Sequence, residues 1–466
     1  MHDPSNTPVS DVPPFLPDAV RVFRCTRWSF DPVASEATFE YALDEDIVLQ
    51  EVFTFAPPSQ SLSSARRLAF ERVLAHLHLA AGLSYYKLAA PPTVRIECGT
   101  WTDDEIAFHR TLLAKGLGEY SWHNDLEAEL LPAFEYRAGR PEPAVVGLAL
   151  DAGALVPVGG GKDSCVTIEA LRAARVSVTL VTINRYPVIQ DVIDAAALPD
   201  LAVRRVLDPQ LAVLNANGAR NGHVPVTAIV SLAAAAAAIL HGHDAVIMSN
   251  ERSASEGNVL YRGVEINHQW SKSDEAEQLL AGLLASITPE LSYFSLLRPL
   301  SELDIARRFA QSCSRYLDSF SSCNAAFRLD PLRRVSRWCG RCPKCQFVYL
   351  ALATVLERST LVEILGDELF AASPVDGFRA LLGLTEWKPF ECVGASIECR
   401  VALRLLLDEH HGGERRDGWS GHVVLQELAA EVVAAGMWPN VDDVAAVFEA
   451  TGGFAPPKYV HLLVDA

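Results

Sequence analysis

Three consecutive glycines followed by a lysine form the part of this 466-residue sequence that is best suited to chemistry. Apolar residues 154–158 lead into the run Gly159, Gly160, Gly161, Lys162, Asp163 and Ser164. Glycines let backbone N–H groups crowd around an anion because no Cβ interferes. A helix that starts here adds free N–H groups and the positive end of its dipole. With the charge of Lys162, the run predicts a phosphate-binding loop rather than a glycine-rich turn without a ligand.

The last three residues of the run have the side chains that a bound nucleoside triphosphate requires. We expect Lys162 to contact a phosphate group and Asp163 to hold Mg²⁺, because carboxylates suit hard cations. We expect Ser164 to cap the helix and to bond a phosphate oxygen. The alternative for Asp163 and Ser164 is simple N-capping, and the neighbouring glycines and lysine favour the functional interpretation.

Polar residues also follow two further predicted strands, over residues 176–183 and 245–248. Ligands of a parallel α/β sheet bind at the carboxyl ends of its strands. These junctions contribute the nucleotide-binding candidates Asn184, Ser249 and Asn250 and the further candidates Glu251 and Arg252. The segment 265–272 mixes donors, acceptors and a tryptophan, as polar ligand sites do, and adds the candidates Asn267, His268 and Lys272. The alternatives are a solvated loop and a structural histidine.

Four cysteines have the spacing of metal ligands. Cys339, Cys342 and Cys345 lie close together in the chain, and Cys323 precedes them by sixteen residues. Thiolates spaced by two residues wrap a tetrahedral metal ion, and zinc takes four such ligands. The set predicts a zinc site, and the alternative is a group of free reduced thiols.

Composition limits the classes of function. Lys and Arg total 40 and Asp and Glu total 58, which gives a net charge of −18. An acidic surface repels phosphate backbones, which weighs against a nucleic-acid partner. The start of the chain lacks the basic and apolar regions of a signal peptide, and the longest apolar run, residues 226–240, is too short for a membrane span. We therefore expect a cytoplasmic enzyme with reduced or metal-bound cysteines, a small-molecule substrate and no membrane partner, in an oligomeric state that stays open.

The periodic segments predict an α/β chain in four parts. Residues 1–20 are polar and proline-rich, as in a disordered tail. Residues 21–143 predict an N-terminal α+β domain with two helices, whose N-caps are Ser63 and Thr102. Residues 144–350 alternate strands with helices and predict a doubly wound, mostly parallel sheet that carries the glycine loop. Residues 351–466 predict a helical C-terminal region.

The glycine run resembles the Ser-Gly-Gly-Lys-Asp-Ser signature of the PP-loop ATP pyrophosphatases, with Gly159 in place of the leading serine. It does not fit the common P-loop, because Val156 stands where the first glycine should be. The resemblance implies a PP-loop (HUP-like) fold and an enzyme that cleaves ATP between the α and β phosphates and puts AMP on a carboxylate or carbonyl-type oxygen. The cysteine segment 339–345 is similar to the zinc-bearing segment of a PP-loop relative, the 7-cyano-7-deazaguanine synthases, which implies a closed structural site.

Five segments together resemble one family of this superfamily, the UDP-N-acetylmuramoyl-L-alanyl-L-glutamate epimerases. They are residues 159–164, 249–255, 267–272, 339–345 and 389–394. The resemblance covers most of the chain. It implies ATP- and Mg²⁺-dependent inversion of the terminal glutamate of a peptidoglycan precursor through an acyl-adenylate, with release of AMP and pyrophosphate.

The pair of acid and base that this chemistry needs is left open by the sequence. Cys392 and Glu391 are the first candidates, since a thiol suits α-proton transfer, and Glu251 and His268 are alternatives. Cys392 also fits an inert buried cysteine. Because the substrate is anionic, we expect cations near it, namely Arg252, Arg262 and Lys272. The rival functions are another adenylating enzyme, which forms an amide or nitrile or transfers sulfur, and a nucleotide-binding regulatory protein.

Overall fold

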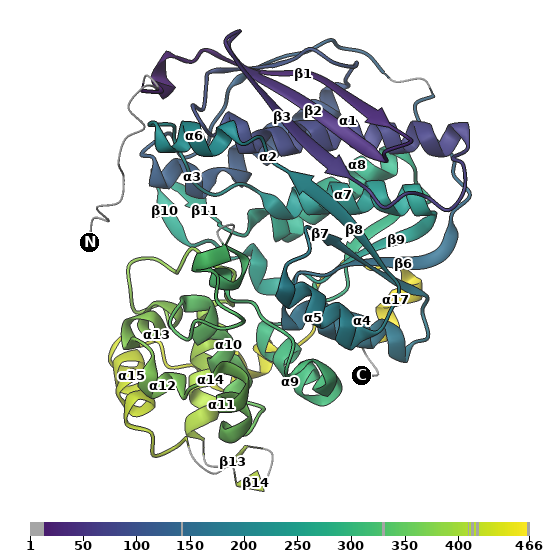
Figure 1. Ribbon diagram of the computed structural model, residues 1–466. Helices are drawn as coiled ribbons and strands as arrows, with labels where there is room; N and C mark the ends of the chain where they lie inside the picture. The colour runs from purple at the N-terminus through teal and green to yellow at the C-terminus, as the bar shows by residue number, and fades with distance from the viewer. Residues whose placement is uncertain are drawn as a thin grey trace.

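The computed structural model describes residues 14–463 apart from 141–142, 329–330, 409, 412–413 and 416–418. Its centre is one ten-stranded sheet in the order β12-β9-β6-β7-β8-β3-β2-β1-β4-β5. The neighbouring strands run parallel except in the pairs β1–β2, β2–β3 and β3–β8. Helices pack on the sheet, and a further group of helices lies to one side of it (Figure 1). The predicted α/β class and the mostly parallel sheet are confirmed.

The N-terminal part is an antiparallel meander of β1, β2 and β3, extended by the parallel strands β4 and β5, with helices packed on it. Its strands are β1 (Val22–Asp31), β2 (Glu36–Leu43), β3 (Ile47–Thr54), β4 (Thr93–Ile96) and β5 (Ala133–Glu135). Its helices are α1 (Ser64–Tyr86), α2 (Asp103–Gly116) and α3 (Gly118–His123). The side chain of Ser63 accepts a hydrogen bond from the Arg66 N–H, and Thr102 forms a capping box with Glu105. Both predicted N-caps are confirmed.

The central part contains the glycine loop. Its strands are β6 (Asp151–Pro157), β7 (Val178–Ile183), β8 (Asp200–Val206), β9 (His243–Met248) and β12 (Ser292–Ser295), with a separate hairpin of β10 (Val259–Tyr261) and β11 (Val264–Ile266). Its helices are α4 (Lys162–Ala173), α5 (Pro187–Ala196), α6 (Gln210–Ala216), α7 (Val226–His241), α8 (Asp274–Ile287) and α9 (Glu302–Ser312). The alanines of α7 are buried in the core that α7 shares with α1. Small side chains let these two helices approach closely, which explains the alanine run in the sequence.

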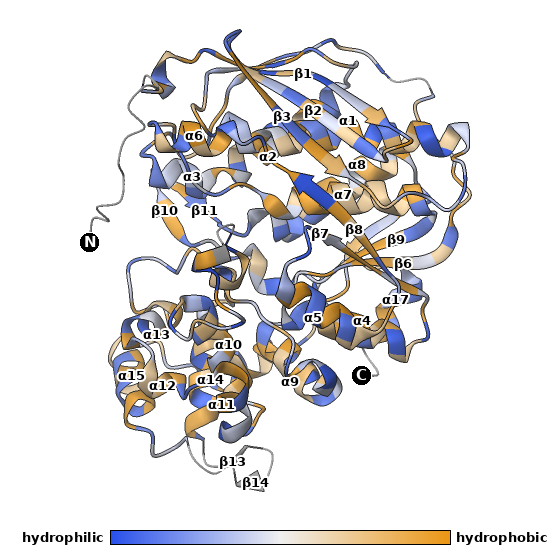
Figure 2. Cartoon of the chain, viewed as in Figure 1, coloured by the Kyte–Doolittle hydropathy of each residue, from blue (hydrophilic) through white to orange (hydrophobic). Residues whose placement is uncertain are grey.

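The C-terminal part is helical, as predicted. Its elements are α10 (Pro343–Ala353), α11 (Arg358–Leu365), α12 (Leu369–Ala372), α13 (Val375–Leu381), α14 (Ser396–Leu407), β13 (His410–His411), β14 (Glu414–Arg415), α15 (Val423–Ala434), α16 (Val441–Phe448) and α17 (Pro457–Val460). Its buried residues continue the core formed by α4, α5 and α9. Figure 2 shows hydrophobic residues along the central strands and on the helices of this part.

The N-terminal and central parts share one sheet, so the strands before and after Pro143 belong to the same layer. The tail predicted for residues 1–20 lies outside the described residues up to position 13, and Pro17–Ala19 form a short 3-10 turn. Within the described ranges, every helix is too short or too polar to cross a bilayer.

A buried ion pair fastens the N-terminal meander to the central sheet where β3 meets β8. The guanidinium group of Arg205 pairs with Glu51, which has 0 % exposure, and its Nη2 donates to Oγ of Ser84 over 2.8 Å. Burial raises the pKa of the Glu51 carboxyl group, and Arg205 limits that increase. Because the carboxylate is fully desolvated, the pairing depends on its one arginine partner.

Replacing Arg205 with methionine is expected to lower the free energy of unfolding by about 3–5 kcal/mol, because it leaves a buried charge without a partner. The double variant Glu51→Gln, Arg205→Met should recover part of that loss. The control is Arg204→Met, since Arg204 is the exposed neighbour on β8, and it should change stability by less than about 0.5 kcal/mol. Urea unfolding followed by circular dichroism measures all three, and equal stabilities of the Arg204 and Arg205 variants would contradict the role of the pair.

Candidate active site

The glycine loop lies at the carboxyl end of β6 and leads directly into α4. Gly160 has a φ of +83°, which residues with a Cβ rarely adopt. A Cβ on Gly161 would lie 2.8 Å from Oγ of Ser322. The Ser321 N–H donates to the Gly160 carbonyl oxygen over 2.8 Å. Gly160 and Gly161 are therefore required for the close approach of residues 321–322 to the loop.

The prediction that Ser164 caps α4 is wrong. The N-cap residue is Gly161, and no side chain caps it; the Ser164 hydroxyl donates back to the Gly161 carbonyl oxygen over 3.0 Å. A glycine N-cap has no side-chain oxygen to occupy the N–H groups of the first turn. These donors are available to an anion at the positive end of the helix.

A cavity of about 430 Å³ opens beside the glycine loop, at the carboxyl ends of β6, β7 and β9. The predicted residues that line it are Gly159, Gly161, Asp163, Ser164, Ser249, Asn250 and Lys272. Its apolar walls include Ile183 and Met248, and Tyr186 contributes an aromatic ring. A cavity of this size with both polar and apolar walls suits a nucleotide. Asn184 is not part of the lining: its side-chain amide bonds the backbone of Arg205 in both directions, at 3.0 and 2.8 Å.

Three carboxylates meet at one edge of the glycine loop. Oxygen atoms of Asp163, Glu251 and Glu302 lie within 4.8 Å of one another. The Lys162 ammonium group, 2 % exposed, lies 2.5 Å from Oδ1 of Asp163 and also pairs with Glu302. Burial lowers the pKa of Lys162, but the two carboxylates raise it by more, so the ammonium group stays charged. Burial also raises the pKa of Glu302, and Lys162 opposes that increase.

A second group of charges surrounds Cys392. Nδ1 of His268 lies 2.5 Å from Oε2 of Glu119, and the His268 ring interacts electrostatically with Cys392. Burial lowers the pKa of His268, but Cys392 and Glu119 raise it to about 9. Burial raises the pKa of Cys392, but Lys272, Lys344 and His268 lower it well below its ordinary value. These pKa directions favour a pair of thiolate and imidazolium over an inert thiol.

Glu119 is a carboxylate of this group that no sequence pattern indicated. It is buried on α3, and besides His268 it contacts His123 (Oε1–Nε2 3.3 Å) and His223 (Oε2–Nδ1 3.6 Å). Burial lowers the pKa of His223 to about 3, so this ring is neutral. A glutamate in a short helix gives no sequence signal for such a role, because His223 and His268 are more than a hundred residues away in the chain.

Asn258 fixes Cys392 and His268 relative to each other through the backbone. Its Oδ1 accepts a hydrogen bond from the His268 N–H over 2.8 Å, and its Nδ2 donates to the Pro389 carbonyl oxygen over 2.7 Å. The Lys388 N–H donates to the Asn258 carbonyl oxygen over 3.0 Å. Asn258 is buried, so these bonds are shielded from competing water.

Several other predicted site residues are engaged elsewhere. Arg252 donates to the backbone carbonyl oxygens of residues 446, 447 and 449 in the C-terminal part. Arg262 pairs with Asp125 and Glu127 at the surface. The Asn267 side chain bonds the backbone of Ala254 and Gln269. Glu391, by contrast, stays close to the cavity: it accepts a hydrogen bond from the cavity-lining residue Asn324, and burial raises its pKa. Of the three predicted substrate cations, Lys272 is the one that lines the cavity.

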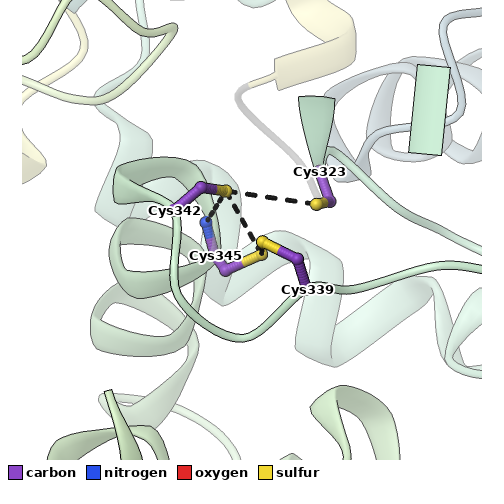
Figure 3. A group of neighbouring side chains, drawn as sticks. All are labelled: Cys323, Cys339, Cys342 and Cys345. Carbon is purple, nitrogen blue, oxygen red and sulfur yellow. Dashed lines mark hydrogen bonds between the residues drawn. The ribbon is translucent and has the colours of Figure 1, made fainter. Parts of the chain in front are cut away.

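The four predicted metal ligands converge on one point (Figure 3). The Sγ atoms are separated by 4.0 Å between Cys323 and Cys342, 3.8 Å between Cys339 and Cys345, and 3.4 Å between Cys342 and Cys345. Sulfur atoms at about 2.3 Å from a tetrahedral ion are roughly 3.8 Å apart. We call Cys323, Cys339, Cys342 and Cys345 the cysteine cage. It has both the donor atoms and the spacing of a structural zinc site.

Comparison with known proteins assigns the family. The family model described as the MurL N-terminal domain matches residues 14–296, and that of the MurL C-terminal domain matches residues 319–442. Three relatives carry the name UDP-N-acetyl-alpha-D-muramoyl-L-alanyl-L-glutamate epimerase. The Micromonospora protein is 43% identical over 95% of this chain and 98% of its own length. The Salinispora tropica protein is 44% identical, over 95% of both chains.

The third relative, from Xanthomonas oryzae pv. oryzae, is 42% identical over 83% of this chain and 86% of its own length. Both family models together span the glycine loop, the surroundings of Cys392 and the cysteine cage. The resemblance inferred from five sequence segments is thus confirmed over the length of the chain. The chain belongs to the family of UDP-N-acetyl-alpha-D-muramoyl-L-alanyl-L-glutamate epimerases.

Proposed function

We propose that this protein inverts the terminal L-glutamate of UDP-N-acetylmuramoyl-L-alanyl-L-glutamate in a reaction that consumes ATP and releases AMP and pyrophosphate, on a PP-loop type of fold. The names of the relatives support the substrate and the inversion. The observation that carries the ATP-dependent route is the position of Lys272. This lysine lines the cavity beside the glycine loop and also acts on the Cys392 thiol.

A nucleotide cavity close to a reactive thiol allows adenylation of the carboxylate to precede removal of the α-proton. A free carboxylate resists loss of its α-proton, because the resulting enolate carries two negative charges. Transfer of AMP from ATP to the α-carboxylate forms a carboxyl–phosphate bond, breaks the bond between the α and β phosphates, and releases pyrophosphate. The carboxylate charge is then removed, and the carbonyl group accepts the electron pair of the α-C–H bond. Hydrolysis afterwards restores the carboxylate and releases AMP.

The carboxylates beside the glycine loop are suited to Mg²⁺. Asp163, Glu251 and Glu302 would hold the ion, because their oxygen atoms converge and are hard ligands. A bound Mg²⁺ neutralises charge on phosphate oxygens. Lys162 lies among these carboxylates and places a second positive charge at the same edge of the cavity. The open N–H groups of α4 bind the phosphates from the other side.

Cys392 is the group we assign to proton transfer on one face of the glutamate α-carbon. Its thiolate takes the α-proton, and the protonated His268 beside it stabilises the thiolate before that step. The opposite face needs a second group that returns a proton. Glu391 is the candidate, since it directly precedes Cys392 in the chain and burial favours its protonated form.

The cysteine cage is proposed to hold a structural zinc ion. All four positions are cysteines at distances near those of a tetrahedral site, and no position is left open for a substrate. A zinc ion in such a site would hold the chain segments together and would not react with a substrate. Metal analysis of the purified protein should find one zinc per chain, and Cys345→Ser should lose it.

Incubation with ATP, Mg²⁺ and the UDP-muramoyl-dipeptide in D₂O is expected to give AMP, pyrophosphate and deuterium at the glutamate α-carbon. Lys162→Ala should abolish AMP formation. Cys392→Ala should abolish deuterium entry and inversion while AMP formation continues, because adenylation needs no thiol. The matched control is Cys98→Ala, a partly buried cysteine in the N-terminal part, which should keep both activities. ATP cleavage by the unaltered protein without deuterium entry would rule out the epimerase mechanism.

The protonation of His268 can be measured directly. Its pKa of about 9 depends on the negative charges of Cys392 and Glu119. Glu119→Gln or Cys392→Ser should therefore lower the pKa of His268, so that the ring loses its proton at a lower pH. Titration of ¹³C-labelled histidine by NMR reports this value. The control variant Glu127→Gln changes an exposed carboxylate that pairs with Arg262 instead, and it should leave the His268 pKa unchanged. A pKa of His268 that is the same in the Glu119 and Glu127 variants would refute the contact.

A further inference from the structure

One lysine of the cysteine cage reaches the nucleotide cavity. Lys344 stands between the cage ligands Cys342 and Cys345 in the first turn of α10, and its side chain lines the 430 Å³ cavity together with Lys272. A cation is disfavoured at the N-terminus of a helix, where the dipole is already positive. Helix stability therefore does not explain a lysine at this position, and a role in the cavity does.

The charge of Lys344 is free to meet a ligand. Among the residues that the structure describes, Lys162 pairs with Asp163 and Glu302 and Lys388 pairs with Glu256, whereas Lys344 forms no ion pair. Lys344 is partly buried, so its charge is less screened than that of a surface lysine. It interacts electrostatically with Glu391 and Cys392, which belong to the proton-transfer group.

The covalent bonds of the proposed acyl-adenylate determine where the reacting carboxyl group must lie. In the proposed reaction, the glutamate carboxyl carbon bonds to AMP on one side and to the α-carbon on the other. It must therefore lie where the nucleotide cavity meets Cys392. Lys272 and Lys344 are the two cavity-lining cations that also act on the Cys392 thiol.

From this overlap, we infer that Lys344, together with Lys272, binds the α-carboxyl group of the substrate, and that the cysteine cage holds Lys344 in place for this purpose. The inference rests on the proposed function. Two ammonium groups attract the carboxylate before adenylation. When the α-proton leaves, they stabilise the negative charge that develops on the carbonyl oxygen.

The cage joins the two chain segments that this geometry requires. Cys323 lies between Ser322 and Asn324, which also line the cavity. The preceding residue Ser321 bonds the glycine loop at Gly160. Linking Cys323 to Cys342 and Cys345 therefore fixes the position of Lys344 relative to the glycine loop, across the cavity.

Lys344→Met is expected to reduce kcat/KM for the UDP-muramoyl-dipeptide by about 10²–10³-fold, the loss seen when a group that stabilises transition-state charge is removed. The zinc content and the melting temperature should stay unchanged, and Lys344→Arg should restore part of the rate. The matched control is Arg341→Met, which removes a cation from the same cage loop but outside the cavity lining, and it should keep full activity. Unchanged inversion by the folded Lys344→Met protein would overturn the inference, while ATP-dependent inversion by the unaltered protein would still stand.

A double-mutant cycle tests whether the cysteine cage positions Lys344. Cys339→Ser should lose zinc and lower inversion to a similar degree, and adding Lys344→Met to it should cause little further loss, because both changes remove the same interaction. If the Cys339→Ser protein lacks zinc but keeps full inversion activity, the cage does not position Lys344. The same conclusion follows if the double variant loses activity by the product of the two single losses. If Cys339→Ser does not fold, Cys323→Ser in the facing segment replaces it in the same cycle.

Discussion

Lys272 is the charge on which the rest of the site depends, because it joins two buried groups that would otherwise be unrelated. Burial lowers the pKa of Lys272, but Cys392, Glu251 and Asp163 raise it by more. The first of these neighbours belongs to the proton-transfer group and the other two to the carboxylates beside the glycine loop. Charge alternates along the whole path from Glu302 through Lys162, Asp163, Lys272 and Cys392 to His268 and Glu119. Each buried charge is compensated by the next, which is the condition for keeping so many ionised groups out of water.

The sheet topology brings these groups together from distant parts of the sequence. Lys162 follows β6, Glu251 follows β9 and Glu302 begins α9 after β12, so the parallel strands deliver three of them to one edge. Glu119 comes instead from α3 in the N-terminal part, and Cys392 comes from the segment before α14 in the C-terminal part. Each of the three parts of the chain therefore supplies a residue of the proposed site.

Much of the central part could be predicted from the sequence, because local chemistry specifies it. Three glycines between an apolar run and a helix are typical of a loop that binds phosphate, and the cavity does lie beside them. The cysteine spacing identified the cage for the same reason. Glu119 could not be found in this way, since nothing in its sequence neighbourhood indicates a site. Lys344 lies within the predicted cysteine motif, but the cysteine spacing assigns no role to the lysine between the ligands. Arg252 shows the opposite difficulty: its position after β9 indicated a ligand, yet its guanidinium group binds backbone carbonyl oxygens of the C-terminal part. The N-cap predicted at Ser164 was wrong because Gly161 takes the capping position three residues earlier, whereas those at Ser63 and Thr102 were right.

The antiparallel contact between β3 and β8 limits how the chain can be divided. Along residues 52–54, the meander covers the edge of a strand that carries the exposed valine Val206. A fragment that begins after residue 143 would retain the glycine loop but present β8 as an open edge. Uncovered strand edges recruit other chains and aggregate. Excising the nucleotide module as a tool for biochemistry would thus yield a fragment that associates with itself.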